Sequence, residues 1–479
     1  MNRPIVRLYG LVALLFALLV AFTSRWTVFE ASSLRENPLN ARRLLEQERI
    51  DRGSILAADG TVLARSVPRR EGVYERTYPT GAEFAHAIGY YYNTGLGSSG
   101  LEQYRSSDLN GQRGTNLQGV LDQLQGKEPR GDKVITTLQP GAQKVANAAL
   151  AGHRGAIVAL DPRTGAVTAM ASSPSYDPNS LRSESAYKKL LQNVTGSPLT
   201  NRAVQNGYAP GSTFKVVTAT AAIDTGAYTP ESTVSGRDDL LVSGVPLAND
   251  NHESFGAITL TQALVHSVNT VWAQVAEKLG KRTLARYMAR FGFDRKPQLD
   301  YPADEMSSSG EYEGGRLFSP TSNLVDVGRM GIGQDKLEVT ALQMAEVAAA
   351  VANHGRLMAP HLTGRIVNAE GQTVQQIAPR VQSVVMKPST ASAVTGMMEA
   401  VVKEGTGVAA QIPGVQVAGK TGTAETQIGN AINNVWFIAF APATNPSVAV
   451  AVTLQDVPGE GATFAAPVAR EVMEQLLHD

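Results

Sequence analysis

Residues 414–421, with the sequence GVQVAGKT, have the spacing of a phosphate-binding loop, Gly-x-x-x-x-Gly-Lys-Thr, and this stretch constrains the fold most. Such a loop needs a buried strand before its first glycine and a helix after its last residue. Here Pro413 directly precedes the first glycine, residues 415–418 have the composition of a strand, and Gly422 is a poor residue for a helix interior. The sequence therefore favours a strand that carries Lys420 over a nucleotide-binding loop.

A serine and a lysine lie three residues apart in the stretch YAPGSTFKVVTATAAIDTG, residues 208–226. Its Pro-Gly pair predicts a turn and its apolar run a helix, so Ser212 and Lys215 share one face of the first helical turn. A lysine can act as base for a serine nucleophile if burial and a second cation lower its pKa well below about 10.4. Taken alone, the pair is more simply explained as a helix cap and a surface lysine, and the same spacing recurs at Ser185 and Lys188 in a polar segment.

Two further motifs follow along the chain. Ser267-Val268-Asn269 opens another apolar helical run, and Lys420-Thr421-Gly422-Thr423 lies on the predicted strand. Motifs of the types Ser-x-x-Lys, Ser-x-Asn and Lys-Thr-Gly, in this order and on these kinds of element, are typical of serine enzymes that act by acyl transfer. The three motifs together predict a serine–lysine acyl-transfer site.

At this point the chain resembles the class B penicillin-binding proteins, the monofunctional peptidoglycan D,D-transpeptidases of bacteria. The resemblance covers nearly the whole chain, and its short N-terminal region is most similar to that of actinobacterial members. The stretches that carry it are PLTNRAVQNGYAPGSTFK (198–215), GIGQDKLEVTALQMAEVAAAVANHG (331–355), AGKTGTAE (418–425) and RGSILAADG (52–60). The last stretch resembles an N-terminal signature of the family, although Ala57 and Ala58 depart from the commoner polar residues.

The resemblance implies a role for each polar residue of the first two motifs. Ser212 would attack the carbonyl between the two terminal D-alanines of a stem peptide, and Lys215 would receive its proton. Ser267 would relay a proton to the leaving amine, and Asn269 would hydrogen-bond the lysine and the substrate amide. The amine of a second stem peptide would then take the acyl group and close the cross-link. Which group acts as the base is left open.

The third motif, by the same resemblance, would bind the substrate. Lys420 would supply a second positive charge near the first lysine and, with Thr421 and Thr423, bind the terminal carboxylate. The backbone N–H groups of Ser212 and Thr423 would form the oxyanion hole, which stabilises charge that develops in the transition state. Gly422, which has no Cβ, would let the substrate approach the edge of the strand.

Residues 131–479 predict an α+β domain. Besides residues 415–418, four apolar runs predict strands: Ile157–Leu160, Ala166–Ala171, Val435–Ala441 and Val448–Leu454. A long, mostly helical middle separates the two early strands from the three late ones, and the resemblance implies a penicillin-binding transpeptidase domain with a five-stranded antiparallel sheet flanked by helices. Thr340 and Gln343 predict a helix capping box, and Pro467 predicts the start of the last helix.

An apolar segment lies at the N-terminus. Arg3 and Arg7 precede the stretch Leu8–Phe22, whose length is close to the roughly 17–25 residues that cross a hydrocarbon core. We interpret residues 1–24 as a membrane anchor that is not cleaved, with a cleaved signal peptide as the alternative. The flanking positive charge favours an N-terminus inside and a body outside, and thus a single-pass protein of the cell membrane.

Residues 25–130 predict a small, extended pedestal domain. Within it, residues 51–66 predict a hairpin around the turn Asp59-Gly60. The segment between anchor and larger domain is too short for an added glycosyltransferase domain, which argues against the bifunctional relatives.

The composition excludes several kinds of site. The 479 residues include no cysteine, which excludes thiol nucleophiles, disulfides and Cys-based metal sites. Lys and Arg number 43, as do Asp and Glu, so a net charge of zero gives no support for a nucleic-acid partner. The resemblance implies no metal and no cofactor. It implies as partners peptidoglycan stem peptides or their lipid-linked precursor, β-lactam antibiotics, the membrane, and a polytopic peptidoglycan glycosyltransferase.

Two other classes of function stay open. A D,D-carboxypeptidase or a β-lactamase would share the motifs. Class A β-lactamases place Glu-x-x-x-Asn between the second and third motifs, and the one match found here is Glu36–Asn40, outside the domain. A non-catalytic β-lactam sensor or scaffold is the other alternative, but sensors carry several membrane spans and a scaffold would have lost motif residues. Roles in elongation and in division are not separated by the sequence.

Overall fold

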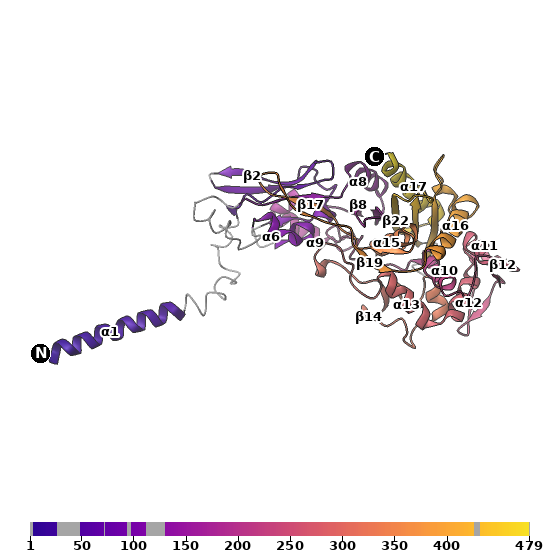
Figure 1. The fold of residues 1–479 in the computed structure, drawn as a ribbon, viewed down its shortest axis with the longest axis horizontal. Helices are drawn as coiled ribbons and strands as arrows, with labels where there is room; N and C mark the ends of the chain where they lie inside the picture. The colour runs from indigo at the N-terminus through magenta and orange to yellow at the C-terminus, as the bar shows by residue number, and fades with distance from the viewer. Residues whose placement is uncertain are drawn as a thin grey trace.

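The structure, a computed structural model, describes residues 3–25, 48–70, 72–92, 97–111, 130–425 and 432–478. Figure 1 shows an elongated body with the early strand β2 (Val62–Arg70) toward one end and the helices of the second half of the chain toward the other. Antiparallel strands with helices inserted between them confirm the predicted α+β class.

A five-stranded antiparallel sheet forms the centre of the larger domain, as the resemblance implied. Its strands run in the order β20-β21-β22-β7-β8. Their bounds are β7 Arg154–Leu160, β8 Val167–Ser173, β20 Ala418–Glu425, β21 Asn433–Ala441 and β22 Val448–Val457. The early and late strands meet where β22 pairs with β7 and Ala449 lies opposite Leu160. Sequence-distant segments therefore share one sheet.

Both faces of this sheet are covered by helices, and the central strand β21 is accordingly apolar at each position from Val435 to Ala441. Successive side chains of a strand point to opposite faces. Along β21, Trp436 packs into the core that contains α15 (Ala341–Ala352). The next residue, Phe437, packs into a second core that contains α8 (Pro140–Ala149) and α17 (Gly461–His478).

The predicted strand over Val415–Ala418 is wrong for its first three residues, because β20 begins at Ala418. Residues 412–415 form a tight turn in which the Val415 N–H donates to the Ile412 carbonyl at 3.1 Å. Pairing with β21 instead selects the polar residues that follow, from Ala418 opposite Phe440 onward.

The last helix begins at Gly461 and not at Pro467, which lies inside it. A proline inside a helix removes one backbone N–H. Ala465, Ala466 and Ala469 are buried against the sheet, and this packing holds the helix on both sides of the proline.

The predicted capping box at α15 is half right. Thr340 Oγ1 accepts from the Gln343 N–H at 3.2 Å, as expected of the cap. The Gln343 side chain, however, donates to the Phe291 carbonyl at 2.8 Å, and the Thr340 N–H donates to Ser309 Oγ at 3.0 Å. Contacts with Phe291 and Ser309, distant in sequence, replace the expected bond between the Gln343 side chain and the Thr340 N–H.

The helical middle of the larger domain surrounds these elements. Its helices are α9 Glu184–Gln192, α10 Lys215–Asp224, α11 Leu260–Val265, α12 Asn269–Leu279, α13 Lys281–Phe291, α14 Val327–Gly331 and α16 Pro388–Glu404. Short strand pairs lie between them: β9 Thr233–Ser235 with β12 Ala257–Thr259, β10 Leu240–Val242 with β11 Val245–Leu247, β13 Gly310–Glu313 with β14 Arg316–Phe318 and β15 Leu337–Glu338, and β16 Arg356–Met358 with β19 Val381–Val384.

The pedestal is built on a six-stranded sheet in the order β18-β17-β6-β1-β2-β3. Its remaining strands are β1 Ile55–Leu56, β3 Val73–Thr77, β6 Lys133–Thr136, β17 Thr363–Val367 and β18 Thr373–Gln376. The predicted hairpin is confirmed, since β1 and β2 pair around Asp59, whose Oδ1 accepts from the Thr61 N–H at 2.9 Å. Three of the six strands come from beyond residue 131, so the domain boundary placed there stays a prediction.

A buried ionic cluster fixes the base of the pedestal. Glu102 is 0% exposed and accepts from Arg52 Nε at 2.8 Å and from Arg76 Nε at 2.6 Å. Burial alone would raise the pKa of Glu102, but Arg76 and Arg52 hold it below its usual value. Gly53 follows Arg52 because a Cβ there would lie 1.9 Å from the Asp132 carbonyl oxygen.

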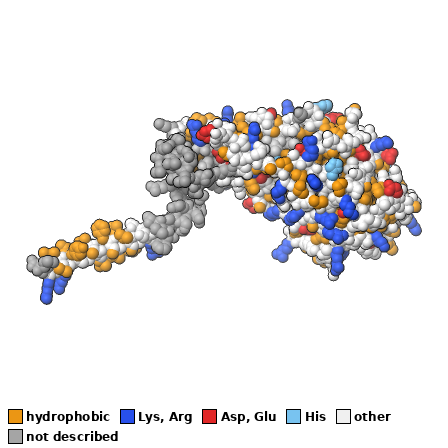
Figure 2. Space-filling view, viewed as in Figure 1, with side chains coloured by type: hydrophobic (Ala, Val, Ile, Leu, Met, Phe, Trp, Pro, Cys, Tyr) orange, Lys and Arg blue, Asp and Glu red, His pale blue; other side chains and the backbone are white. Residues whose placement is uncertain are grey.

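The N-terminal helix α1 spans Arg3–Ser24, and none of its residues is buried. Hydrophobic side chains cover it along its length, whereas charged side chains are mixed over the body (Figure 2). Within the described ranges, α1 is the one helix long and apolar enough to cross a membrane. The Glu36–Asn40 match lies outside the described residues.

Candidate active site

The predicted nucleophile lies in a tight turn. Ser212 is the second residue of a 3₁₀ turn, Gly211–Phe214, that leads directly into α10. Gly211 has φ 53° and donates its N–H to the Gly333 carbonyl at 2.9 Å. A Cβ on Gly211 would lie 2.5 Å from the Thr423 carbonyl oxygen and 3.1 Å from its backbone nitrogen. The turn is thereby pressed against β20, and the two backbone N–H groups predicted for the oxyanion hole lie on adjacent segments.

Lys215, the first residue of α10, connects the first motif to the second. Its side chain is 0% exposed. Lys215 Nζ donates to the Ser267 carbonyl at 2.6 Å and to Asn269 Oδ1 at 2.7 Å, and it lies 3.3 Å from Ser267 Oγ. Within the described part of the chain, no hydrogen bond engages the Ser212 hydroxyl. Catalytic hydrogen bonds often form only when substrate is bound.

Ser267 lies between α11 and α12 in the left-handed region of backbone space, with φ 57°. A non-glycine residue rarely adopts this conformation, and such residues cluster at functional sites. Here it directs both the carbonyl and the hydroxyl of one residue at the same lysine. Asn269 opens α12, and its Nδ2 donates to the Ala248 carbonyl at 3.1 Å, which turns its amide oxygen toward Lys215.

Lys420 of the third motif also contacts the Ser267 hydroxyl. Lys420, on β20 opposite Ile438, is 0% exposed. Its Nζ donates to Ser267 Oγ at 3.0 Å and to the Thr421 carbonyl at 3.1 Å. The hydroxyl of Ser267 therefore lies between the two lysines, and the structure brings all three motifs together around it.

Burial controls the charge of both lysines. It lowers the pKa of Lys215 well below 10.5, and the neighbouring charge of Lys420 lowers it further. Burial also lowers the pKa of Lys420 to about 7. A neutral Lys215 amine has two N–H donors, which the Ser267 carbonyl and Asn269 Oδ1 satisfy. The third contact of Nζ is Ser267 Oγ at 3.3 Å, so the lone pair of the neutral amine can accept a proton from a hydroxyl at that position.

The two threonines of the third motif are held differently. Thr421 Oγ1 lies 2.7 Å from Thr406 Oγ1, and Thr423 Oγ1 accepts from the Gly461 N–H at 3.3 Å. Sequence reasoning missed Thr406, whose flanking glycines, Gly405 and Gly407, were the only local signal. It also missed the Ala248 carbonyl, which carries no sequence signal because any residue supplies one.

Gly422 makes room for the nucleophile turn. A Cβ at this position would lie 2.6 Å from the Pro210 carbonyl oxygen, 2.9 Å from Thr213 Cγ2 and 3.0 Å from Trp436 Cβ. Protein atoms thus fill the place of a Cβ, and the approach of substrate to the strand edge at Gly422 stays a prediction. The glycine lets the turn that carries Ser212 approach β20.

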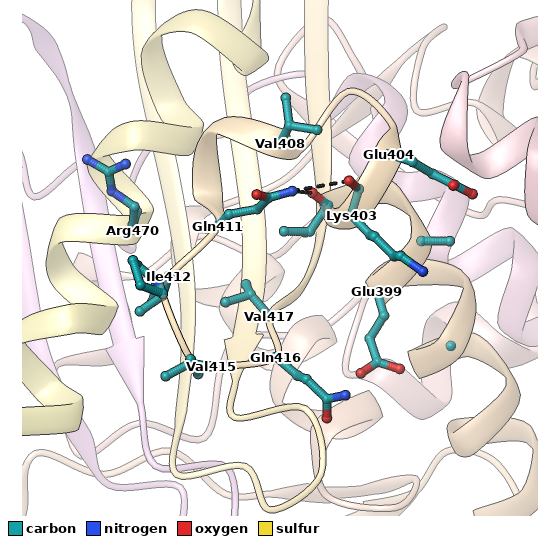
Figure 3. Close-up of a pocket in the computed structure, with 15 residues that line it drawn as sticks. Glu399, Lys403, Glu404, Val408, Gln411, Ile412, Val415, Gln416, Val417 and Arg470 are labelled. Atoms are coloured by element: carbon teal, nitrogen blue, oxygen red, sulfur yellow. Dashed lines mark hydrogen bonds between the residues drawn. The ribbon is translucent and has the colours of Figure 1, made fainter.

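Two hollows lie near this region. One, of about 280 Å³, lies beside the motif residues and is lined by Asn249, Val268 and Thr406 among others. The other, of about 920 Å³, lies between α16 and Arg470 of α17, and Gln411 at its wall donates to the carbonyls of Val402 and Lys403 (Figure 3). No motif residue lines the larger hollow, so we assign the site to the motifs and not to cavity size.

Comparison with known families decides the membership of the chain. Residues 155–474 match the model described as penicillin binding protein transpeptidase domain, and residues 52–134 match the penicillin binding protein A dimerisation domain. The chain is a class B penicillin-binding protein. The resemblance of the motifs to this family is therefore confirmed.

Relatives of this penicillin-binding protein extend over its full length. It is 35% identical to peptidoglycan D,D-transpeptidase PbpA of Mycolicibacterium smegmatis, with all of both chains covered. It is 31% identical to peptidoglycan D,D-transpeptidase MrdA of Acinetobacter baumannii over 85% of this chain and 67% of that one. The likeness to actinobacterial penicillin-binding protein A is thus confirmed.

Solved structures share the fold. The ceftriaxone acyl-enzyme complex of penicillin-binding protein A from Mycobacterium tuberculosis is 34% identical, with a TM-score of 0.78 over 90% of this chain and 100% of that one. Its imipenem acyl-enzyme complex has the same identity and coverage and a TM-score of 0.79. These structures confirm the predicted fold of this penicillin-binding protein.

Proposed function

We propose that this protein is a peptidoglycan D,D-transpeptidase that cross-links stem peptides through an acyl-enzyme on Ser212 and is acylated and inhibited by β-lactams. One observation carries the proposal: the hydroxyl of Ser267 lies 3.0 Å from Lys420 Nζ and 3.3 Å from Lys215 Nζ, two buried lysines with lowered pKa values. The names of the relatives and the acyl-enzyme structures support it.

In the acylation half-reaction, Ser212 Oγ attacks the carbonyl between the two terminal D-alanines. Its proton passes to the lone pair of Lys215, whose neutral form is favoured by burial and by the charge of Lys420. Ser267 then relays a proton to the leaving D-alanine amine. The backbone N–H groups of Ser212 and Thr423 stabilise the oxyanion.

Substrate is positioned by the remaining motif residues in this proposal. Lys420, Thr421 and Thr423 bind the terminal carboxylate, whose negative charge favours the protonated form of the lysine. Asn269 holds Lys215 and the substrate amide. The contribution of Gly422 is to bring the nucleophile turn onto β20. The amine of a second stem peptide then attacks the ester and returns Ser212 to its free state.

The cellular setting is part of the proposal. Helix α1 is apolar enough to span a membrane, which suits a substrate assembled on a lipid carrier outside the cell. We place the N-terminus inside, the body outside and a single pass between them, on the charge of Arg3 and Arg7. The proposed division is anchor 1–24, pedestal 25–130 and transpeptidase domain 131–479. A polytopic glycosyltransferase that makes the glycan strands is the proposed partner.

A peptide-acceptor assay separates this function from its alternatives. The full chain in detergent is mixed with a pentapeptide stem ending in D-Ala-D-Ala and an excess of acceptor stem peptide. A transpeptidase yields a cross-linked dimer with release of D-alanine, and Ser212→Ala yields none. Free tetrapeptide as the sole product would instead identify a carboxypeptidase, and turnover of penicillin without a lasting adduct would identify a β-lactamase.

A further inference from the structure

The pedestal contains a cavity of about 570 Å³ that no part of the proposed chemistry uses. It lies between β2, β3 and the segment around Tyr91, and Arg182 of the larger domain closes one side. Tyrosines form part of its wall, and the Arg52 guanidinium lies 3.9 Å from the centroid of the Tyr91 ring.

Arginines dominate the lining of this cavity, which we call the pedestal pocket. Its charged lining residues are Arg52, Arg69, Arg70, Arg76, Arg182, Glu48 and Glu75. Glu102, the buried partner of Arg52 and Arg76, lies directly behind them. Five guanidinium groups against three carboxylates leave an excess of positive charge, although the whole chain has a net charge of zero. An excess of cations in a concave site attracts anions.

Arg76 lines the pocket, and one nitrogen of its guanidinium group is not paired by the described residues. The residue is 6% exposed, its Nε donates to Glu102, and its Nη1 donates to the Gly53 carbonyl at 2.8 Å. Its Nη2 is buried and has no hydrogen-bond partner within the described part of the chain. Buried polar groups in proteins are almost always paired, so this guanidinium nitrogen is a donor for an acceptor that the described residues do not supply.

The mouth of the pocket has donors that are only partly used. Glu75 accepts from Arg69 Nε at 2.5 Å and forms an ion pair with Arg182 Nε at 3.1 Å, so one carboxylate holds two guanidinium groups in place. Arg70 is exposed and forms no ion pair among the described residues. A guanidinium has five N–H donors, so each of these arginines keeps donors for a further acceptor.

We propose that the pedestal pocket binds a phosphate group. Arginine forks match the paired oxygens of a phosphate, and several arginines around one concave site are typical of phosphate recognition. The phosphate can belong to a lipid headgroup or to a soluble phosphate compound. Helix α1 ends at Ser24 and the pocket begins at Glu48, and a connection of that length spans at most about 80 Å. The pocket is therefore tethered near a membrane surface.

Isothermal titration of the full chain in detergent with inorganic pyrophosphate tests this proposal. The wild type should bind at one site. Arg69→Gln/Arg70→Gln, two exposed changes at the mouth, should weaken binding at least tenfold without changing the rate of acylation by penicillin. The control Arg163→Gln/Arg356→Gln removes two exposed arginines elsewhere and should bind like the wild type. Arg76→Lys, which keeps a cation beside Glu102 but removes the unpaired nitrogen, should also weaken binding.

The proposal would be overturned if the wild type did not bind pyrophosphate. It would also be overturned if the Arg69/Arg70 variant and the Arg163/Arg356 control lost pyrophosphate affinity equally. Measurements in lipid nanodiscs distinguish the two sources of the phosphate, a lipid headgroup and a soluble compound. Discs with phosphatidylglycerol should weaken pyrophosphate binding by competition if a headgroup is the ligand, relative to discs with equal surface charge from a fatty acid. Equal affinity in both discs would assign the pocket to a soluble phosphate compound.

Discussion

The side-chain oxygen of Asn269 lies 2.7 Å from Lys215 Nζ, and its amide nitrogen is anchored on the Ala248 carbonyl. This relationship orients the lysine. With a second N–H donated to the Ser267 carbonyl, a neutral Lys215 keeps its lone pair for the position where Ser267 Oγ lies 3.3 Å away. Asn269 thus binds the proposed base and also fixes its orientation.

Replacing Lys215 by arginine tests its role as base. Arginine keeps the positive charge but is not deprotonated in proteins. We expect the second-order rate of acylation by penicillin to fall by about 10²–10⁴-fold, the range of general base catalysis. A fluorescent penicillin and quenched-flow sampling would measure it. The matched control is Lys188→Arg, at an exposed lysine with the same serine spacing, and it should react at the wild-type rate.

The acylation rate should depend on pH with two limbs of opposite sign. The base must be neutral, so the rate rises with pH through the lowered pKa of Lys215. Lys420, which we propose binds the substrate carboxylate, must be charged, so the rate falls as pH rises through its pKa, about 7. Values of kcat/KM report these groups in the free enzyme.

The variant Lys420→Arg assigns the falling limb. Arginine stays protonated across the accessible range, so the fall above pH 7 should disappear while the rising limb remains. A falling limb that survives this change would contradict the assigned charge state of Lys420.

Gly422→Ala tests how closely the nucleophile turn packs on β20. The new Cβ would lie 2.6 Å from the Pro210 carbonyl oxygen, so the turn must move. We expect a loss of about 1–3 kcal/mol in the free energy of unfolding. Displacement of Ser212 by about 1 Å should also slow acylation about 100-fold. Urea unfolding and the acylation assay measure the two effects.

Gly396→Ala is the matched control for that change. Gly396 lies inside α16 and a Cβ there meets nothing within 4 Å, so alanine should stabilise the protein by about 0.5–1 kcal/mol. Its acylation rate should stay at the wild-type value. Equal stability and equal acylation rates of the two alanine variants would contradict the importance of the close contact at Gly422.

Glu346 in α15 should make stability fall as pH rises. Burial raises the pKa of this carboxyl to about 8, compared with 4.5 in the unfolded chain. Between these values the folded protein holds a proton that the unfolded chain releases, so stability is greatest below pH 4.5 and declines toward pH 8. The slope from this group is about 1.4 kcal/mol per pH unit.

Glu346→Gln removes that titration. Urea unfolding at pH 5 and pH 8 should show that the free energy of unfolding of the variant, relative to that of the wild type, increases with pH. Glu370→Gln, at an exposed position, should leave the pH dependence unchanged. Parallel pH profiles for wild type and Glu346→Gln would contradict the buried, protonated carboxyl.

The central strands could be predicted because burial on both faces requires an apolar residue at every position, and VWFIAFA in β21 meets that requirement. The start of β20 could not, because its polar residues are selected by pairing with β21 and not by their own composition. The same holds for the pedestal, where β17 joins β6 from more than 200 positions away. Long-range pairing leaves no local pattern.

The residues of the candidate site followed from three motifs, but their supports did not. Ser212, Lys215 and Lys420 are marked by spacing and chain order. Thr406 and the Ala248 carbonyl reach the site through loops that fold back from elsewhere. The packing of the Pro210 carbonyl against Gly422 could not be predicted either, because sequence cannot show which neighbour fills the place of a missing Cβ.

The central claim is that Ser212 is the nucleophile, and intact-mass spectrometry after reaction with penicillin tests it most directly. The full chain should gain the mass of one penicillin and keep it, and Ser185→Ala, which removes the serine of the second Ser-x-x-Lys spacing, should do the same. Ser212→Ala should gain nothing while keeping its fold. An adduct on folded Ser212→Ala, or none on the wild type, would contradict the serine–lysine mechanism.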